Sequence, residues 1–175
     1  MAASKHELDQ FLATWDMEAN NTVRMLESLP ADKYDYRPDL TGRSLGELAW
    51  HLAEVDAFMT YGIETGVFDF SMKPPNLERP REVKALAPGY RRVHDDAVAR
   101  ITRLKPQDLD RKLKYFNGEQ MRVGDILWGA LLHHQIHHRG QLGLVNRLAG
   151  GKSPGVYGPN REEMAAMRAN AQAKA

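Results

Sequence analysis

The stretch LLHHQIHHRGQLGLVNRL, Leu131–Leu148, decides the fold because it is the clearest amphipathic segment of this 175-residue chain. Its apolar residues recur at steps of three and four, which is typical of a helix with one buried face. The pattern extends back to Val123, and Gly150 provides a stop signal. The sequence therefore predicts one long helix over 123–148.

Four of the seven histidines fall within this stretch, as the overlapping pairs His133/His137 and His134/His138. A rotation of about 100° per residue separates the two pairs. His134 shares its direction with an apolar stripe: Val123, Leu127, Ala130, Leu131, Val145 and Leu148. We therefore expect His134 and His138 to point into the protein, and His133 and His137 to lie nearer the boundary.

Two buried imidazoles one turn apart need partners for their ring nitrogens. A metal ion would satisfy them, and the alternative is a pair of core histidines bonded to their neighbours. A third ligand would come from a facing helix, for which His51 is the best candidate. His94 is a weaker one because charged residues surround it in the sequence. Three histidines would leave coordination positions for water or substrate, as catalytic sites do.

Three further helices are predicted. The first starts at Ser4, which forms a capping-box pattern with Glu7, and closes before Pro30. The second starts at Ser44 and ends near Gly66. The third covers 83–104, where Pro88-Gly89 indicates either a kink or a later start.

Shorter elements complete the predicted architecture. Asn117-Gly118, between the apolar runs 112–116 and 119–123, predicts a two-residue hairpin turn. Asn160 is a candidate cap for a short terminal helix through Met167. With four long amphipathic segments, the chain is expected to be all-α: a single domain over 1–175, with a four-helix bundle at about 4–149 and a C-terminal loop and helix at 150–175.

The composition narrows the classes of function. The net charge is +1 with no basic stripe, so nucleic-acid binding is not expected. The absence of cysteine leaves histidine and carboxylate side chains as metal ligands. No apolar run could span a bilayer and the N-terminus lacks the apolar core of a signal peptide, so we expect a water-soluble cytoplasmic protein without membrane association.

Three motifs together resemble the DinB/YfiT-like superfamily of metal-dependent proteins: WHLAEVD around His51, HHQIHHRGQL around His134 and His138, and SPGVYG near the C-terminus. The resemblance implies a bundle with up-down-down-up helices, often homodimeric. It also implies a divalent metal, zinc or nickel in first place and iron or manganese as alternatives, held by these three histidines. The doubled His-His is a departure that leaves His133 and His137 unexplained.

Several residues near the expected metal are candidates for further roles. For catalysis these are Glu54, Gln141 and Tyr157, the last on a loop that could fold over the site. For substrate binding they are Trp50, Arg139 and Gln141. Each has a structural alternative: a paired surface carboxylate for Glu54, a backbone-bonded amide for Gln141, core packing for Trp50 and an ion pair for Arg139.

The leading hypothesis is an enzyme whose metal activates water or a low-molecular-weight thiol for attack on a small-molecule substrate, as a hydrolase or a thiol S-transferase. The resemblance favours the thiol version, since S-transferases and isomerases occur in that family. One alternative is a non-catalytic metal-binding or stress-response bundle that acts through protein partners. Another is a plain helical homodimer with bonded core histidines.

Overall fold

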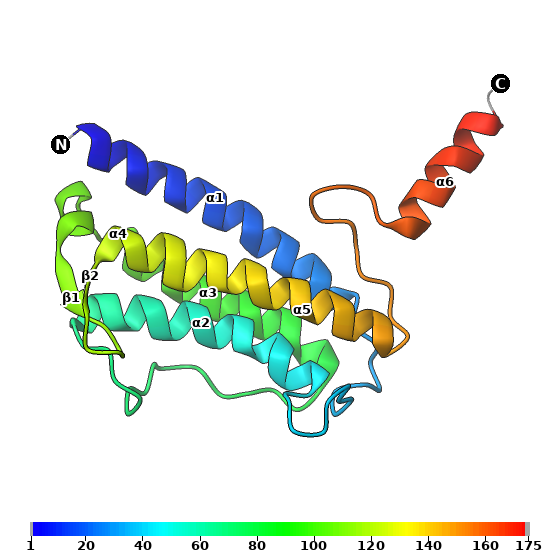
Figure 1. The fold of residues 1–175 in the computed structure, drawn as a ribbon, viewed down its shortest axis with the longest axis horizontal. Coiled ribbons are helices and arrows are strands. Elements are labelled where there is room, and N and C mark those ends of the chain that lie inside the picture. Colours follow the sequence, from blue (N-terminus) through cyan, green and yellow to red (C-terminus); the bar gives the residue numbers. More distant parts are fainter. Residues whose placement is uncertain (1, 174–175) are drawn as a thin grey trace.

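The computed structural model describes residues 2–173, with side chains from residue 6. Four long helical stretches lie side by side (Figure 1). They are α1 (Ala2–Glu27), α2 (Leu45–Thr65), α3 (Leu86–Ile101) and a continuous stretch made of α4 (Val123–Asp125), η3 (Ile126–His133) and α5 (His134–Leu148). In the view of Figure 1, α1 and α5 run one way and α2 and α3 the other. The predicted up-down-down-up bundle is confirmed.

The ends of α2 follow the predicted signals. The Ser44 side chain accepts a hydrogen bond from the Glu47 backbone and Glu47 returns one, which forms a capping box. Gly66 closes the helix at φ 75, a conformation that glycine adopts without steric cost. By contrast, α1 begins at Ala2, ahead of the predicted start. The Ser4 side chain lies outside the described residues.

The third helix is shorter than predicted and unbroken. A single turn, η1 (Val83–Ala85), leads into α3, which ends at Ile101 rather than near residue 104. Pro88 falls in the first turn, where its missing N–H costs no helical hydrogen bond, so the later-start alternative is correct. Gly89 allows the Trp50 ring to approach, since a Cβ there would lie 2.9 Å from it.

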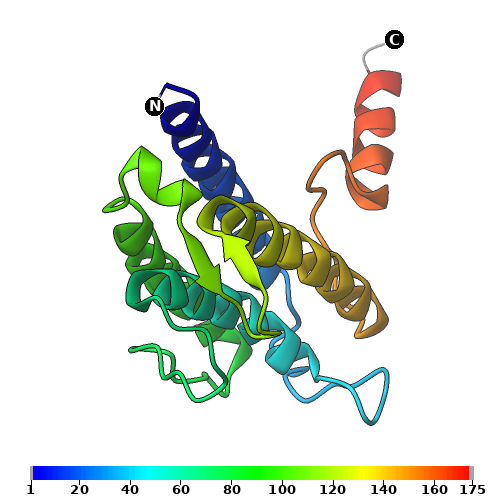
Figure 2. The same ribbon diagram turned by 60° about the vertical axis from the view of Figure 1, so that its left-hand side comes forward.

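The predicted hairpin is present, but its turn is longer than two residues. After η2 (Pro106–Asp110), β1 (Lys112–Lys114) pairs antiparallel with β2 (Gln120–Arg122), with Leu113 opposite Met121. The Tyr115 N–H donates to Glu119, and Gly118 lies at φ 86. The hairpin lies beside the end of the bundle where α4 begins (Figure 2).

The C-terminal helix α6 (Arg161–Gln172) stands away from the bundle (Figures 1 and 2). Asn160 caps it through a reciprocal pair with Glu163, as predicted, but the helix continues five residues past Met167. None of its residues is buried. Arg147 of α5 contacts the first turn of α6 by donating two hydrogen bonds of 2.8 Å to the Glu162 carboxylate.

A buried polar cluster crosses the middle of the bundle. The Asp56 carboxylate, fully buried on α2, accepts hydrogen bonds from Trp15 Nε1 at 3.1 Å, Gln135 Nε2 at 2.7 Å and His94 Nδ1 at 2.8 Å. These residues come from α1, α5 and α3, so one carboxylate joins all four helices. His94 was expected beside a charged face, but it is buried against the Trp15 ring.

The fourth helical stretch contains a π-helical segment, η3, which changes its buried face. The buried stripe runs in steps of four from Val123 through Leu127, Leu131 and Gln135 to Arg139, and then continues through Leu142 and Asn146. A π segment has more residues per turn than an α-helix, so a stripe extrapolated at 3.6 residues per turn falls out of phase. Within the described residues, no helix is both long and apolar enough to cross a membrane.

Candidate metal centre

Three histidines from two helices meet between α2 and α5. His51, on the second turn of α2, has its ring centroid 5.5 Å from that of His134 and 4.7 Å from that of His138. The two α5 rings are 4.6 Å apart. One ring nitrogen from each residue lies within 4.8 Å of the other two. The structure thus brings together the three residues that the sequence had singled out.

The orientation of the α5 pair differs from the expectation. His134 and His138 do not point into the core; they lie half-buried at its edge beside α2, one position before the buried residues Gln135 and Arg139. The π segment is the physical reason, because it rotates the α5 face. The site is therefore a groove open to solvent; His133 and His137 are exposed, and the His137 ring lies edge-on to that of His138 with centroids 5.1 Å apart.

Two of the three rings have a side-chain partner at Nδ1. His51 Nδ1 donates to Glu54 Oε2 at 3.1 Å, and the other carboxylate oxygen accepts from Arg79 at 3.1 Å. His138 Nδ1 donates to Gln141 Oε1 at 2.6 Å. These bonds place the proton on Nδ1 and leave Nε2 with its lone pair, the state in which histidine binds metals.

The surroundings keep the α5 histidines neutral. Burial lowers the pKa of His138 to about 4, although the Gln141 bond opposes the shift. Burial also lowers the pKa of His134, and the nearby His51 adds to this. Neutral imidazoles offer lone pairs, and three such donors suit zinc, nickel and other borderline divalent ions.

Of the predicted catalytic residues, Glu54 and Gln141 contact the histidines. Glu54 is half-buried; burial raises its pKa, but the bonds from His51 and Arg79 outweigh this and lower it overall. Such a carboxylate is a weak base and is well placed to orient His51. Gln141 was expected to face inward, but it is exposed and reaches His138 from the rim.

Three other candidates have structural surroundings, which is the stated alternative for Arg139 and Trp50 and differs from the expectation for Tyr157. Arg139 is buried and forms an ion pair with Glu18 of α1, which is its structural alternative. The Tyr157 hydroxyl donates to Glu18 at 2.9 Å and accepts from Arg139 at 2.6 Å. The loop therefore folds against α1 and α5 rather than over the histidines. Trp50 is 1% exposed and packs in the core.

A cavity of about 330 Å³ adjoins His51 and His134. Its walls come from α2, the loop after α2 and the hairpin turn, and are mostly apolar: Val55, Phe58, Met59, Phe70, Tyr115 and Phe116. Arg43 and Glu54 supply the charged part of the lining. The site thus offers space for a small organic molecule next to the histidines.

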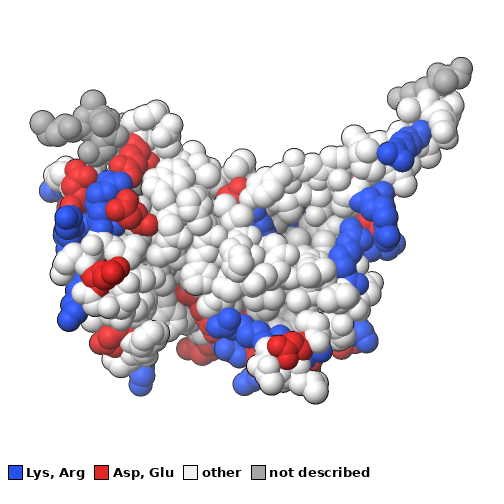
Figure 3. Space-filling model, in the orientation of Figure 1, with Lys and Arg blue, Asp and Glu red and all other residues white. Residues whose placement is uncertain are grey.

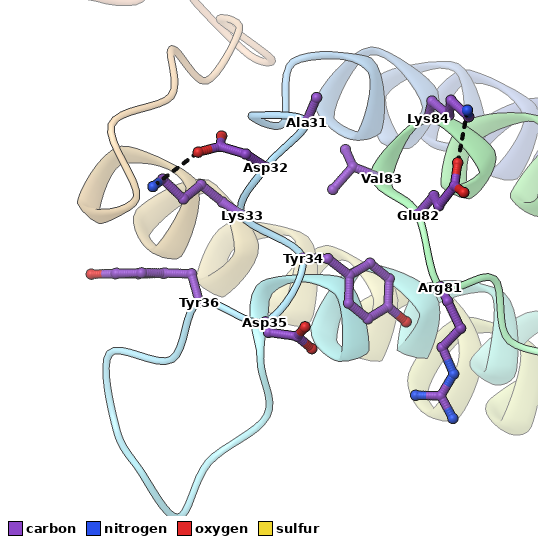
Figure 4. Close-up of a pocket in the computed structure, with 10 residues that line it drawn as sticks. All are labelled: Ala31, Asp32, Lys33, Tyr34, Asp35, Tyr36, Arg81, Glu82, Val83 and Lys84. Atoms are coloured by element: carbon purple, nitrogen blue, oxygen red, sulfur yellow. Dashed lines mark ion pairs between the residues drawn. The ribbon is translucent and has the colours of Figure 1, made fainter.

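A larger hollow, of about 590 Å³, lies at the start of α2 (Figure 4). Its charged residues pair locally, Lys33 with Asp32 and Lys84 with Glu82, on opposite sides of the hollow. The Tyr34 hydroxyl is bonded to the Pro80 carbonyl. No histidine is among its lining residues, so it does not share the donor set of the three-histidine group.

Sequence reasoning missed the Asp56 cluster, although a signal for it exists. Asp56 stands between Val55 and Ala57 in an apolar helical run, and Gln135 lies inside the histidine stretch. A carboxylate within such a run is rarely buried without donors. The cluster connects α2, which carries His51, with α5, which carries His134 and His138, and with α1 and α3.

Comparison with known proteins agrees with this architecture. The family model of the DinB family matches residues 1–174. YrdA of Bacillus subtilis is 35% identical over 163 residues, covering 90% of this chain and 92% of that protein. A DinB-like protein from Bacillus cereus superposes with a TM-score of 0.71 at 29% identity, covering 85% and 97% of the two chains. A second, YjoA of Bacillus subtilis, gives 0.67 at 26% identity, with 87% and 99% covered. The chain belongs to the DinB family.

Proposed function

We propose that His51, His134 and His138 hold a divalent metal ion, with zinc or nickel the best match to three imidazole donors. The single observation that carries this proposal is the convergence of three ring nitrogens within 4.8 Å. Hydrogen bonds from the Nδ1 atoms of His51 and His138 support it, since they orient the free nitrogens.

The proposed activity is that of a metal-dependent hydrolase or thiol S-transferase acting on a small molecule. A bound metal would supply a Lewis acid that lowers the pKa of water or of a thiol. Glu54, held by Arg79, orients His51, and Gln141 orients His138. The apolar cavity excludes water from one side of the groove and accommodates the substrate.

Metal content tests the first part of the proposal. Protein purified without an affinity tag should contain close to one equivalent of metal, measured by mass spectrometry of the digested sample. The substitution His134→Ala should abolish this, because two histidines make a much weaker site. His133→Ala is the matched control, since His133 is the exposed neighbour on the same helix. Equal metal content in both variants would refute the assignment.

Activity separates an enzyme from a metal-binding bundle that acts through partners. The metal-loaded protein is tested against esters, and against electrophiles with several low-molecular-weight thiols. If the parent protein turns over a substrate, and His134→Ala loses this activity while His133→Ala keeps it, the result supports the enzyme hypothesis. Metal binding without turnover in either series favours the non-catalytic alternative.

We also propose that the exposed side of the fourth helical stretch pairs with a second copy of the chain. After Asp125 in its first turn, the exposed residues of this stretch are uncharged: Gly129, His133, His137, Gly140, Gln141, Leu144 and Leu148. No atom lies within 4 Å of a Cβ built at Gly129 or Gly140, so the fold itself does not need glycine there. The middle of the face seen in Figure 3 is correspondingly poor in charge. Such a face suits close packing against another helix.

A further inference from the structure

The cavity beside the histidines has a stack of aromatic rings at its outer wall. Phe70 stacks on Phe116 with ring centroids 4.9 Å apart and an interplanar angle of 28°. Tyr115 contacts the edge of Phe116 at 5.0 Å. Phe70 is nevertheless 89% exposed. An exposed ring at the rim of an apolar cavity gains stability when a flat ligand covers it.

The polar end of the same cavity carries an arginine without a partner among the described residues. Arg43 makes no hydrogen bond or ion pair within that part of the chain, whereas Arg37 and Arg79 both pair with Glu47. Arg43 also borders the neighbouring hollow that contains Gln141. It therefore stands beside the histidine groove with its guanidinium donors available.

The one carboxylate of the cavity lining does not compete for Arg43. Both oxygens of Glu54 are engaged, one by His51 and the other by Arg79. The charge of this carboxylate is thus balanced locally. Arg43 favours an anion at this end of the cavity, because guanidinium binds carboxylates through paired hydrogen bonds.

We propose that the cavity binds a small aromatic acid, with its ring system against Phe70 and Phe116 and its carboxylate toward Arg43. The volume of about 330 Å³ matches a one- or two-ring molecule. This inference rests on the proposed function in taking the ligand to be the substrate at the three-histidine centre. The recognition itself uses only side chains of the chain and needs no metal.

The test uses 2-naphthoate and its neutral counterpart 2-naphthalenemethanol as probes. Binding is measured by isothermal titration calorimetry on full-length protein, treated with chelator and then dialysed. Naphthoate should bind about tenfold more tightly than the alcohol, as expected for one charge-assisted contact at a half-open site. Equal affinities would overturn the assignment of an acid, and no binding of either probe would overturn the proposal as a whole.

Two variants locate the probe. Phe70→Ala should weaken both probes about three- to tenfold, because one ring contact is lost. Arg43→Gln should weaken naphthoate alone and remove its advantage over the alcohol. Both side chains are exposed, so neither change removes a core contact. Unchanged affinities in both variants would place the probe elsewhere and refute the proposal.

Matched controls exclude general surface effects. Leu40→Ala removes another exposed apolar side chain, and Arg161→Gln another exposed arginine, both outside the cavity. Neither should alter binding. Because the titrations use metal-free protein, their result is independent of the metal content of the His134→Ala variant. A chain that binds metal without binding naphthoate contradicts this inference alone, and the reverse result contradicts the metal centre alone.

Discussion

His51 Nδ1 lies 3.1 Å from Oε2 of Glu54, one turn further along α2, and the second oxygen of Glu54 lies 3.1 Å from Arg79. Arg79, in the loop before α3, thus fixes the Glu54 carboxylate, and the carboxylate in turn orients the His51 imidazole. In metal sites such an arrangement fixes the ring and increases its basicity. The relationship gives Glu54 a positioning role.

We expect Glu54→Gln to weaken zinc binding by roughly 10- to 100-fold, since the amide keeps the shape of the side chain and loses its charge. Zinc affinity is measured by competition with a chromophoric chelator. Glu64→Gln is the control, because Glu64 lies on the same helix and pairs with Arg100 and Arg103 instead of a histidine. Equal affinities of the two variants would show that Glu54 does not act on the site.

The sequence contained the helices and the histidine trio because both depend on local signals. Ser44 and Asn160 cap their helices through adjacent residues, so their patterns could be recognised without tertiary information. His134 and His138 could be paired from their spacing, His51 was the best third candidate from its place in another predicted helix, and the family resemblance implied the same set. What these signals could not give was the direction of the α5 face.

The π segment is the main reason for that failure. Rotation at 100° per residue placed His134 among the core residues, whereas the buried stripe reaches Gln135 instead. Where a helix widens depends on packing against its neighbours, which periodicity does not encode. The expected position of Tyr157 over the site was wrong for a related cause. Its contact with Glu18 joins residues far apart in the sequence.

The buried Asp56 cluster predicts a large effect on stability. Asp56→Ala would leave three buried donors, on Trp15, Gln135 and His94, without their acceptor. We expect it to lower the free energy of unfolding by roughly 3–5 kcal/mol, measured by urea denaturation. Asp95→Ala, at an exposed position of α3, should stay within about 0.5 kcal/mol of the parent protein. A loss below about 1 kcal/mol for Asp56→Ala would mean that the cluster adds little to stability.

The uncharged face of α5 predicts the state of association. Leu144, 64% exposed, would face the second copy, and Leu144→Asp would bury a charge there. We expect this variant to be monomeric and the parent chain dimeric in light scattering coupled to gel filtration. Leu40→Asp, at a position 90% exposed on the loop before α2, is the control and should remain dimeric. A monomeric parent chain would rule out the proposed pairing.

The substitution Tyr157→Phe distinguishes a structural role of this hydroxyl from a catalytic one. Its hydroxyl bonds to Glu18 and Arg139, away from the three histidines, so Tyr157→Phe should lower the free energy of unfolding by about 0.5–1.5 kcal/mol. Zinc affinity should be unchanged, because no contact joins Tyr157 to a histidine of the trio in the described part of the chain. Both quantities are measured on the same preparation, by urea denaturation and by chelator competition. Tyr115→Phe provides the comparison, since Tyr115 lines the cavity and its hydroxyl contacts Met59 Sδ at 3.6 Å. Weaker zinc binding by Tyr157→Phe, with stability unchanged, would instead place this hydroxyl at the metal centre.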